Sequence, residues 1–178
     1  MAGYNNIGTD PLRTDHEVSL QNNIGILLND LKGWLGKHYL LEDSTKNFFT
    51  DKSRKNLELD LSSINLLNHD YTFSHIDGRD FDIYVNTPNG VIWYEYPSSG
   101  FKSCLAIIIS IIKEIELRFT HEDLYAAEFN GVIIIDEMEM HLHPEWQGRI
   151  TEVLTTMFPL AQFIVTTHSP PRCAEQQA

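Results

Sequence analysis

A run of β-branched residues that ends in two adjacent carboxylates constrains the fold of this chain more than any other stretch. Gly131 opens the run, Val132 to Ile135 form it, and Asp136 and Glu137 close it. A short, continuous apolar run of this kind predicts a fully buried parallel strand. In open α/β sheets, ligands bind in the crevice beyond the carboxyl ends of the strands. The stretch therefore predicts an α/β fold with a ligand site at Asp136 and Glu137.

A second apolar run with a polar ending follows further along the chain. Residues 162–167 predict another buried strand, which leads directly into His168. Between the two runs, residues 145–157 are predicted to form a helix. A strand–helix–strand segment favours a right-handed parallel crossover. This arrangement places Asp136, Glu137 and His168 at the same edge of the sheet.

Two adjacent carboxylates at such an edge suit phosphoryl transfer. An Asp in this place can hold a magnesium ion, as in the Walker B element of phosphate-binding NTPases. A Glu beside it can orient or deprotonate an attacking water. A plain core strand that ends in solvated acids is the simpler interpretation. It explains the first strand, but it does not explain why a second strand also ends in a polar cluster.

Ser98, Ser99 and Gly100 precede a long predicted helix that runs to about Phe119. Ser98 or Ser99 is a good N-cap, and Gly100 leaves the backbone open to close approach. The first turn presents unpaired N–H groups beside the cation Lys102. Because a helix N-terminus carries about half a positive charge, these groups form an anion site. A plain capped helix is the alternative, and this stretch taken alone favours it.

Residues 1–96 are predicted to form a helical and β-hairpin region, and residues 97–178 an α/β unit. The elements predicted in the first region are helices at 18–39 and 44–68 and strands at 71–75, 81–85 and 91–96. Ser44, Thr45 or Asp51 is expected to cap the second helix. Gly90 is expected to take a positive φ in the turn before the last strand.

The acidic composition limits the functions that fit. A net charge of −12 over 178 residues argues against a nucleic-acid clamp, because phosphate contacts need clustered Lys and Arg. The two cysteines make no disulfide framework, and Cys104 is expected to be a small core residue. The longest apolar run is too short to cross a bilayer, and residues 1–16 do not resemble a signal peptide. We therefore expect a cytoplasmic protein that does not contact a membrane.

Four stretches together resemble the nucleotide-site elements of ABC-type ATPases. Residues 98–103 resemble the signature motif, 132–137 resemble Walker B, 139–144 resemble a D-loop of the HLHP form, and 163–170 resemble the switch-histidine motif. Each is weak alone, but their order and spacing are similar to the ABC-type heads of the SMC/RecF/OLD class. The closest resemblance is to bacterial predicted ATP-binding proteins, which include Septu-type anti-phage defence ATPases.

This resemblance implies a P-loop NTPase-like lobe that binds ATP and Mg²⁺ at sites shared by two heads paired head to tail. Asp136 would bind magnesium, Glu137 would polarise the attacking water, and His168 would contact the γ-phosphate. The residues implied to face the γ-phosphate of a nucleotide on the partner head are Ser98, Ser99, Gly100 and Lys102. The implied partners are a second head, which is another copy or the missing N-terminal lobe, and an effector nuclease. Nucleic acid is a further candidate.

The sequence departs from the family in one important respect. It contains no G-x-x-x-x-G-K-[ST] phosphate loop, and Leu31 and His38 stand where the nearest match would need Gly and Ser or Thr. The family carries that loop upstream of the other motifs. We therefore expect an incomplete lobe, as a fragment, a truncated frame or one piece of a split ATPase. Alone, it is expected not to hold ATP tightly.

Two other functions remain open. The missing loop favours a non-catalytic ABC-like module that completes or regulates a partner's site. A metal-dependent hydrolase or nuclease is the second alternative, because several side chains near the sheet edge are metal-ligand types. The candidate ligands are Asp136, Glu137, His141, His143 and His168.

Overall fold

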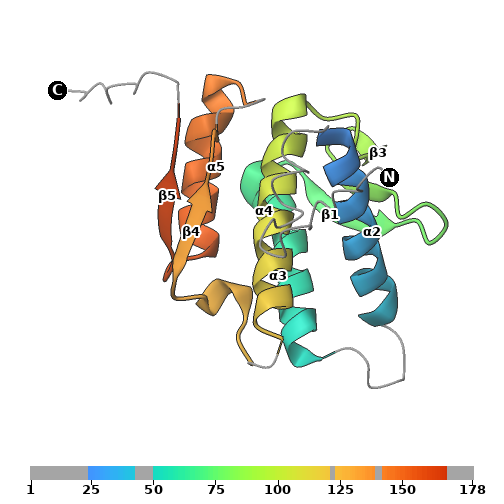
Figure 1. Cartoon of the computed structure of the whole chain (residues 1–178). Helices are drawn as coiled ribbons and strands as arrows, with labels where there is room; N and C mark the ends of the chain where they lie inside the picture. Colours follow the sequence, from blue (N-terminus) through green and yellow to red (C-terminus); the bar gives the residue numbers. More distant parts are fainter. Residues whose placement is uncertain (1–23, 43–49, 121–122, 139–141, 168–178) are drawn as a thin grey trace, which may run out of the picture.

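The computed structural model describes residues 24–42, 50–120, 123–138 and 142–167 of the chain. In chain order, the elements are α2 (Ile24–Glu42), α3 (Asp51–Leu67), β1 (Thr72–Ile76), β2 (Ile83–Thr87), β3 (Gly90–Trp93), α4 (Ser99–Arg118), the 3-10 turn η1 (Ala126–Glu128), β4 (Val132–Ile135), α5 (Pro144–Met157) and β5 (Gln162–Val165). Helices α3 and α4 occupy the centre, with α2 on one side and α5, β4 and β5 on the other (Figure 1). The order confirms a mixed α/β fold with a parallel strand pair.

Helix α3 begins later than its apolar pattern predicts. Thr50 is its N-cap, because the Thr50 hydroxyl accepts a hydrogen bond from the backbone N–H of Ser53 at 3.1 Å. The prediction of Asp51 as the cap was wrong, since Asp51 already lies in the first helical turn, where its charge suits the helix dipole. Residues 44 and 45 lie outside the described residues, as do residues 18–23 of the first predicted helix.

Strands β1, β2 and β3 form an antiparallel meander. Gly90 has a φ of 116°, which confirms the predicted turn and explains why a glycine stands there. The third strand is shorter than predicted and ends at Trp93. Beyond it the chain turns, and the Tyr96 N–H donates to the Trp93 carbonyl at 3.0 Å. This turn leads the chain into α4.

Helix α4 supplies much of the hydrophobic core. Its buried residues are Gly100, Phe101, Ser103, Cys104, Leu105, Ala106, Ile108, Ile109, Ile112 and Ile115. Cys104 is fully buried, as predicted, and burial raises the pKa of its thiol to about 12. The thiol therefore stays protonated and acts as a small apolar group.

A polar network joins α2, α3 and α4. The Glu116 carboxylate of α4 accepts hydrogen bonds from Ser53 Oγ at 2.9 Å and from Asn56 Nδ2 at 2.8 Å. His38 Nε2 lies 3.0 Å from the same carboxylate, and Asn56 Oδ1 accepts from the Ala126 N–H at 2.9 Å. Burial acts to raise the pKa of Glu116, but the hydrogen bonds from these three side chains outweigh it and leave the pKa lowered. The ionised carboxylate thus ties the three helices together.

Asp60 of α3 is a buried acid close to this network. The residue is only 1% exposed, and neither carboxylate oxygen has a hydrogen-bond partner among the described residues. Burial, and secondarily the charge of Glu116, hold the pKa of Asp60 well above its usual value. The fold therefore favours the protonated form of this side chain.

Strands β4 and β5 pair in parallel, with Ile134 opposite Ile164, as the strand–helix–strand segment predicts. The prediction that both strands are fully buried was wrong. Ile135 and Phe163 pack against the core, and Phe163 meets the Phe158 ring edge-on at a centroid distance of 6.3 Å. On the opposite face, Ile134 is 71% exposed and Ile164 is 47% exposed. Period-two alternation places successive side chains on opposite faces, and only one face of this two-stranded sheet is covered by the described residues.

Within the described part of the chain, no helix combines the length and the apolar character that crossing a bilayer requires.

Candidate functional site

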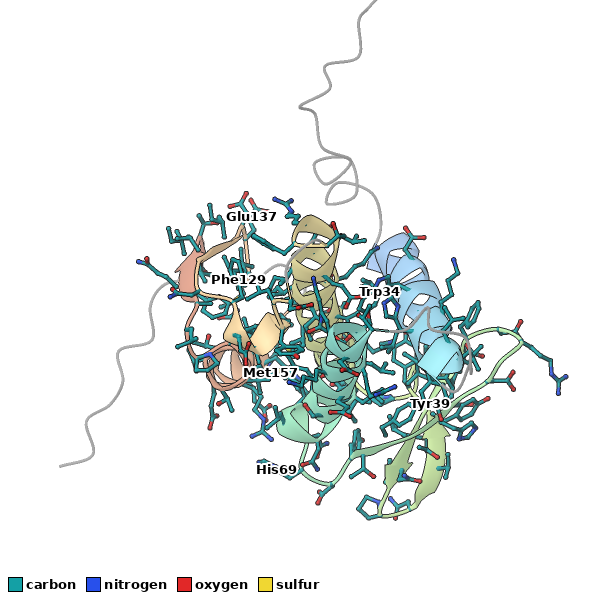
Figure 2. The ribbon with its side chains drawn as sticks, turned by 90° about the horizontal axis from the view of Figure 1, so that it is seen from below. Trp34, Tyr39, His69, Phe129, Glu137 and Met157 are labelled. Atoms are coloured by element: carbon teal, nitrogen blue, oxygen red, sulfur yellow. The ribbon has the colours of Figure 1, made fainter. Side chains whose placement is uncertain are left out.

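The carboxyl ends of β4 and β5 and the N-terminus of α4 lie at the same end of the molecule (Figure 1). This is the end at which the sequence predicts a ligand site. Asp136 and Glu137 follow β4, Thr166 follows β5, and Ser98 precedes α4. Figure 2 shows Glu137 at the outside of the molecule, on the side of β4 and β5.

Thr166 connects the two acids that follow β4. The strand ladder continues beyond the assigned strands, since the Thr166 N–H donates to the Ile135 carbonyl at 3.0 Å. The Thr166 hydroxyl accepts from the Glu137 N–H at 2.8 Å and donates to Oδ1 of Asp136. Because a hydroxyl can donate once and accept as well, both bonds form at the same time. The parallel register therefore brings these three residues into one group.

Glu137 has a φ of 49°, in the left-handed region. This conformation costs a non-glycine residue about 1–2 kcal/mol, and it persists only where neighbouring contacts impose it. Here the amides of Glu137 and Met138 both donate to Thr166, the second to its carbonyl at 3.3 Å. The chain therefore turns sharply at Glu137, the residue that is predicted to activate water.

Ser98 is the N-cap of α4 and is one of the two serines predicted for that position. Its hydroxyl accepts from the Phe101 N–H at 3.3 Å. Ser99 follows in the first turn and is exposed. The ammonium of Lys102 donates to the Glu95 carbonyl at 3.2 Å, which holds its stem along the turn before the helix. The helix N-terminus and Ser99 are therefore accessible, while Lys102 is already engaged by backbone.

Gly100 serves a different purpose from the one predicted. The expectation that its backbone is open to close approach was wrong on the Cα side, because Gly100 is buried against Trp146 of α5. A Cβ at this position would lie 2.2 Å from Cδ1 of the Trp146 ring. The glycine thus lets α4 and α5 approach each other. Its predicted contact with a nucleotide stays a prediction.

The histidines of the predicted site are less informative. His141 and His168 lie outside the described residues. His143 is exposed and is the N-cap residue of α5, where its side chain makes no capping hydrogen bond. In the part of the chain that the structure describes, no group of three or more His, Cys, Asp and Glu side chains is placed to hold a metal ion. The metal-dependent hydrolase therefore gains no support from the described residues.

The side chains present nevertheless suit a single magnesium ion held with a nucleotide. Asp136 is exposed, and the bond from Thr166 uses only its Oδ1 oxygen. Oδ2 therefore keeps its lone pairs for a cation or for a water bound to one. Mg²⁺ is commonly held by one or two carboxylates, with waters and substrate phosphates completing its shell. Sequence reasoning overlooked Thr166 as a site residue, although its place at the polar end of the second strand was the available signal.

The chain matches the family model described as "AAA domain, putative AbiEii toxin, Type IV TA system" over residues 6–171. It belongs to this AAA-domain family. The family assignment confirms the ATPase-type resemblance that the four motifs predict.

Several bacterial proteins are similar to this AAA domain. Septu protein PtuA of Bacillus thuringiensis is 40% identical over 167 residues, which cover 90% of the chain and 42% of PtuA. The Retron Ec83 probable ATPase of Escherichia coli is 37% identical over 92 residues, or 52% of the chain and 17% of that protein. The Retron Vc95 probable ATPase of Vibrio cholerae serotype O1 biovar El Tor is 52% identical over 73 residues, which cover 41% of the chain and 14% of that protein.

This AAA domain therefore spans about two-fifths of the length of its PtuA relative and less of the retron ATPases. Among solved structures, an SMC head bound to the C-winged helix domain of ScpA is similar with a TM-score of 0.48 and 16% sequence identity. The similarity covers 80% of the chain and 45% of that head.

Proposed function

We propose that the chain is the lobe of an ABC-type ATPase that carries the magnesium-binding and water-activating acids, and that it works in anti-phage defence. The observation that carries the proposal is the group of Asp136, Glu137 and Thr166 at the carboxyl ends of two parallel strands. The similarity to a Septu protein and to retron probable ATPases supports the pathway. The phosphate loop is supplied by another segment or polypeptide.

The proposed roles follow from the chemistry of each group. Magnesium, when bound with ATP, neutralises charge on the phosphates. Asp136 would hold that ion, either directly or through a bound water. Glu137 orients the attacking water and accepts its proton, which is worth about 10²–10⁴ in rate. His168 is proposed to contact the γ-phosphate.

The N-terminus of α4 is proposed to act on a nucleotide bound by a second head. Ser98 caps the helix, and the exposed Ser99 stands in its first turn, so their neighbourhood presents partial positive charge to an anion. A γ-phosphate that is held by the phosphate loop of the partner would complete this contact. The proposed partners are therefore a second head and, downstream, an effector nuclease.

The test is Glu137→Gln, measured with this chain joined to or mixed with a polypeptide that carries G-x-x-x-x-G-K-[ST]. The amide keeps the shape of the carboxylate but cannot accept a proton. ATP binding should persist, while hydrolysis should fall by about 10²–10⁴. Glu152→Gln, at an exposed position on α5, is the matched control and should behave as wild type. Turnover of Glu137→Gln close to wild type would sink the catalytic assignment.

A non-catalytic role within an assembly of ATPase heads is the second candidate. In that case the chain would complete or regulate a partner's site without turning over ATP. Calorimetric titration with Mg·ATP separates the two functions when it is combined with the ATPase assay. A partner that hydrolyses ATP equally well with wild type and with Glu137→Gln would favour the regulatory role.

A further inference from the structure

The most informative feature beyond the residues to which the motifs give a role is the way in which Thr166 binds the end of β4. Three of its polar groups contact three residues there: its N–H donates to the Ile135 carbonyl, its hydroxyl accepts from the Glu137 N–H, and its carbonyl accepts from the Met138 N–H. The hydroxyl also donates to Asp136. A threonine that merely ended a strand would need only the backbone contacts.

We propose that Thr166 is a positioning residue of the ATPase site, whose hydroxyl holds the Asp136 carboxylate and the Glu137 backbone in one fixed arrangement. The inference rests on the proposed function, because it assigns Asp136 to the metal and Glu137 to the water. It adds a residue to which neither the motif pattern nor the resemblance gives a role.

The hydroxyl fixes the metal-binding side chain first. Its single proton goes to Oδ1 of Asp136, which limits rotation of the carboxylate. Oδ2 is then held in one orientation, in which it would bind a cation or a water of its shell. Partners that orient a metal-binding carboxylate in this way typically change metal affinity or activity by about 10–100-fold when they are removed.

The same oxygen fixes the direction of the second acid. Glu137 stands at a φ of 49°, so its Cβ leaves the backbone in a different direction from that of an extended strand residue. The hydrogen bond from its N–H to Thr166 Oγ1, at 2.8 Å, anchors that conformation. Without the hydroxyl, this anchor is lost, and the direction of the Glu137 carboxylate relative to Asp136 is fixed less tightly.

The chemistry of position 166 provides matched variants. Thr166→Val keeps the shape and the β-branched character of the side chain but removes the hydroxyl. Thr166→Ser keeps the hydroxyl and loses only a methyl group. Thr151→Val is the control, because the Thr151 hydroxyl donates only to the Gln147 carbonyl within α5.

The first measurement does not depend on catalysis, and it compares all variants in an Ile134→Lys background, which should reduce self-association through the exposed face of β4 and β5. Amide hydrogen exchange of Glu137, followed by NMR, should become about tenfold faster in Thr166→Val, as expected for the loss of one hydrogen bond. Thr166→Ser and Thr151→Val should keep the wild-type exchange rate. An unchanged Glu137 rate in Thr166→Val would overturn the inference.

The second measurement uses the assembly that supplies a phosphate loop. Thr166→Val should raise the Mg²⁺ concentration for half-maximal hydrolysis, or lower kcat, by about 10–100-fold. The KM for ATP should stay near the wild-type value, because the phosphate loop holds the nucleotide. Thr166→Ser should restore most of the activity. Wild-type turnover in Thr166→Val, or equal losses in the valine and serine variants, would overturn the positioning role.

These outcomes separate the inference from the proposed function. If Glu137→Gln abolishes hydrolysis while Thr166→Val does not affect it, the ATPase assignment stands and the role of Thr166 falls. If the wild-type assembly shows no hydrolysis that depends on Glu137, the proposed function falls. Mn²⁺ binding to the chain, measured by electron paramagnetic resonance, then decides whether Thr166 positions Asp136: Thr166→Val should weaken it about 10–100-fold, and unchanged binding would overturn the inference.

Discussion

Replacing Gly100 by alanine should push apart the two helices that meet at the proposed site. The added Cβ would lie 2.2 Å from Cδ1, 2.5 Å from Nε1 and 2.6 Å from Cγ of Trp146. Ordinary van der Waals contact begins near 3.4 Å, so the ring must move by about 1.2 Å (3.4 minus 2.2). Such a movement disturbs the edge-on packing of the ring against Phe101, whose centroid lies 6.1 Å away.

The magnitude follows from two opposing effects. Overpacking a well-filled core costs about 1–3 kcal/mol. Replacing glycine by alanine in a helix contributes at most about 1 kcal/mol of stability, and less in a first turn such as that of Gly100. The net result should be a loss of up to about 2 kcal/mol in the free energy of unfolding. For a chain of this size, each kcal/mol corresponds to about 2–4 °C in Tm.

Urea unfolding followed by circular dichroism measures this loss. Gly148→Ala is the matched control on α5, where nothing lies within 4 Å of the added Cβ, and it should stabilise the protein by about 0.5–1 kcal/mol. In a Trp146→Leu background, Gly100→Ala should cost less, which a double-mutant cycle detects as coupling. If Gly100→Ala is as stable as wild type, or shows no coupling with residue 146, the packing explanation is refuted.

Three further predictions concern the partner contact, a buried acid and the exposed sheet. Ser99→Arg should change the free energy of unfolding by no more than about 0.5 kcal/mol, because Ser98 is the cap. In an assembly with a phosphate loop, the same variant should prevent ATP-dependent dimerisation and hydrolysis. If light scattering shows unchanged dimerisation, the N-terminus of α4 is only a capped helix end. Asp60 has a raised pKa in the fold, so its contribution to stability is complete below the unfolded value of about 3.9 and declines as the pH rises toward the folded value. Asp60→Asn should therefore be more stable than wild type at pH 8. Its free energy of unfolding should also change less with pH between pH 5 and 8, where Glu116 remains ionised. If urea unfolding gives the same pH dependence for the variant and the wild type, this prediction is contradicted. The wild-type chain alone should self-associate through the apolar face that includes the 71%-exposed Ile134, and Ile134→Lys should reduce the association; a monodisperse wild-type monomer would refute the prediction.

Much of the fold was predictable because its signals are local. Helical spacing of apolar residues predicted α2, an apolar stripe predicted α3, and the two serines before an apolar run predicted that α4 begins at a Ser98 or Ser99 cap. The positive φ of Gly90 was predictable in the same way, since a turn needs a residue without a side chain. The cap of α3 was missed because it depends on which side chain accepts a hydrogen bond from an amide in the first helical turn, here that of Ser53. The spacing of apolar residues does not define the first residue of a helix that accurately.

The position of Asp136 and Glu137 beside the end of the second strand was predictable for a reason that is also local. Two strands that each end in polar residues, joined by a helix, bring those residues to one sheet edge whatever the rest of the molecule does. Asp136 and Glu137 could therefore be placed there from the sequence, and the structure places Thr166 beside them. The proposed catalytic roles depend on a nucleotide and remain predictions.

Local signals in the sequence were enough to predict most of the elements, their order and the edge at which the acids gather, because residues within one or two turns of each other carry that information. The contacts between distant segments came from tertiary packing alone. It set the strand register that brings the Thr166 hydroxyl to Asp136 and Glu137, the close approach that makes Gly100 a spacer for Trp146, and the exposure of Ile134. These features depend on which surfaces finally meet, and packing between segments far apart in the chain leaves no periodic pattern in either segment.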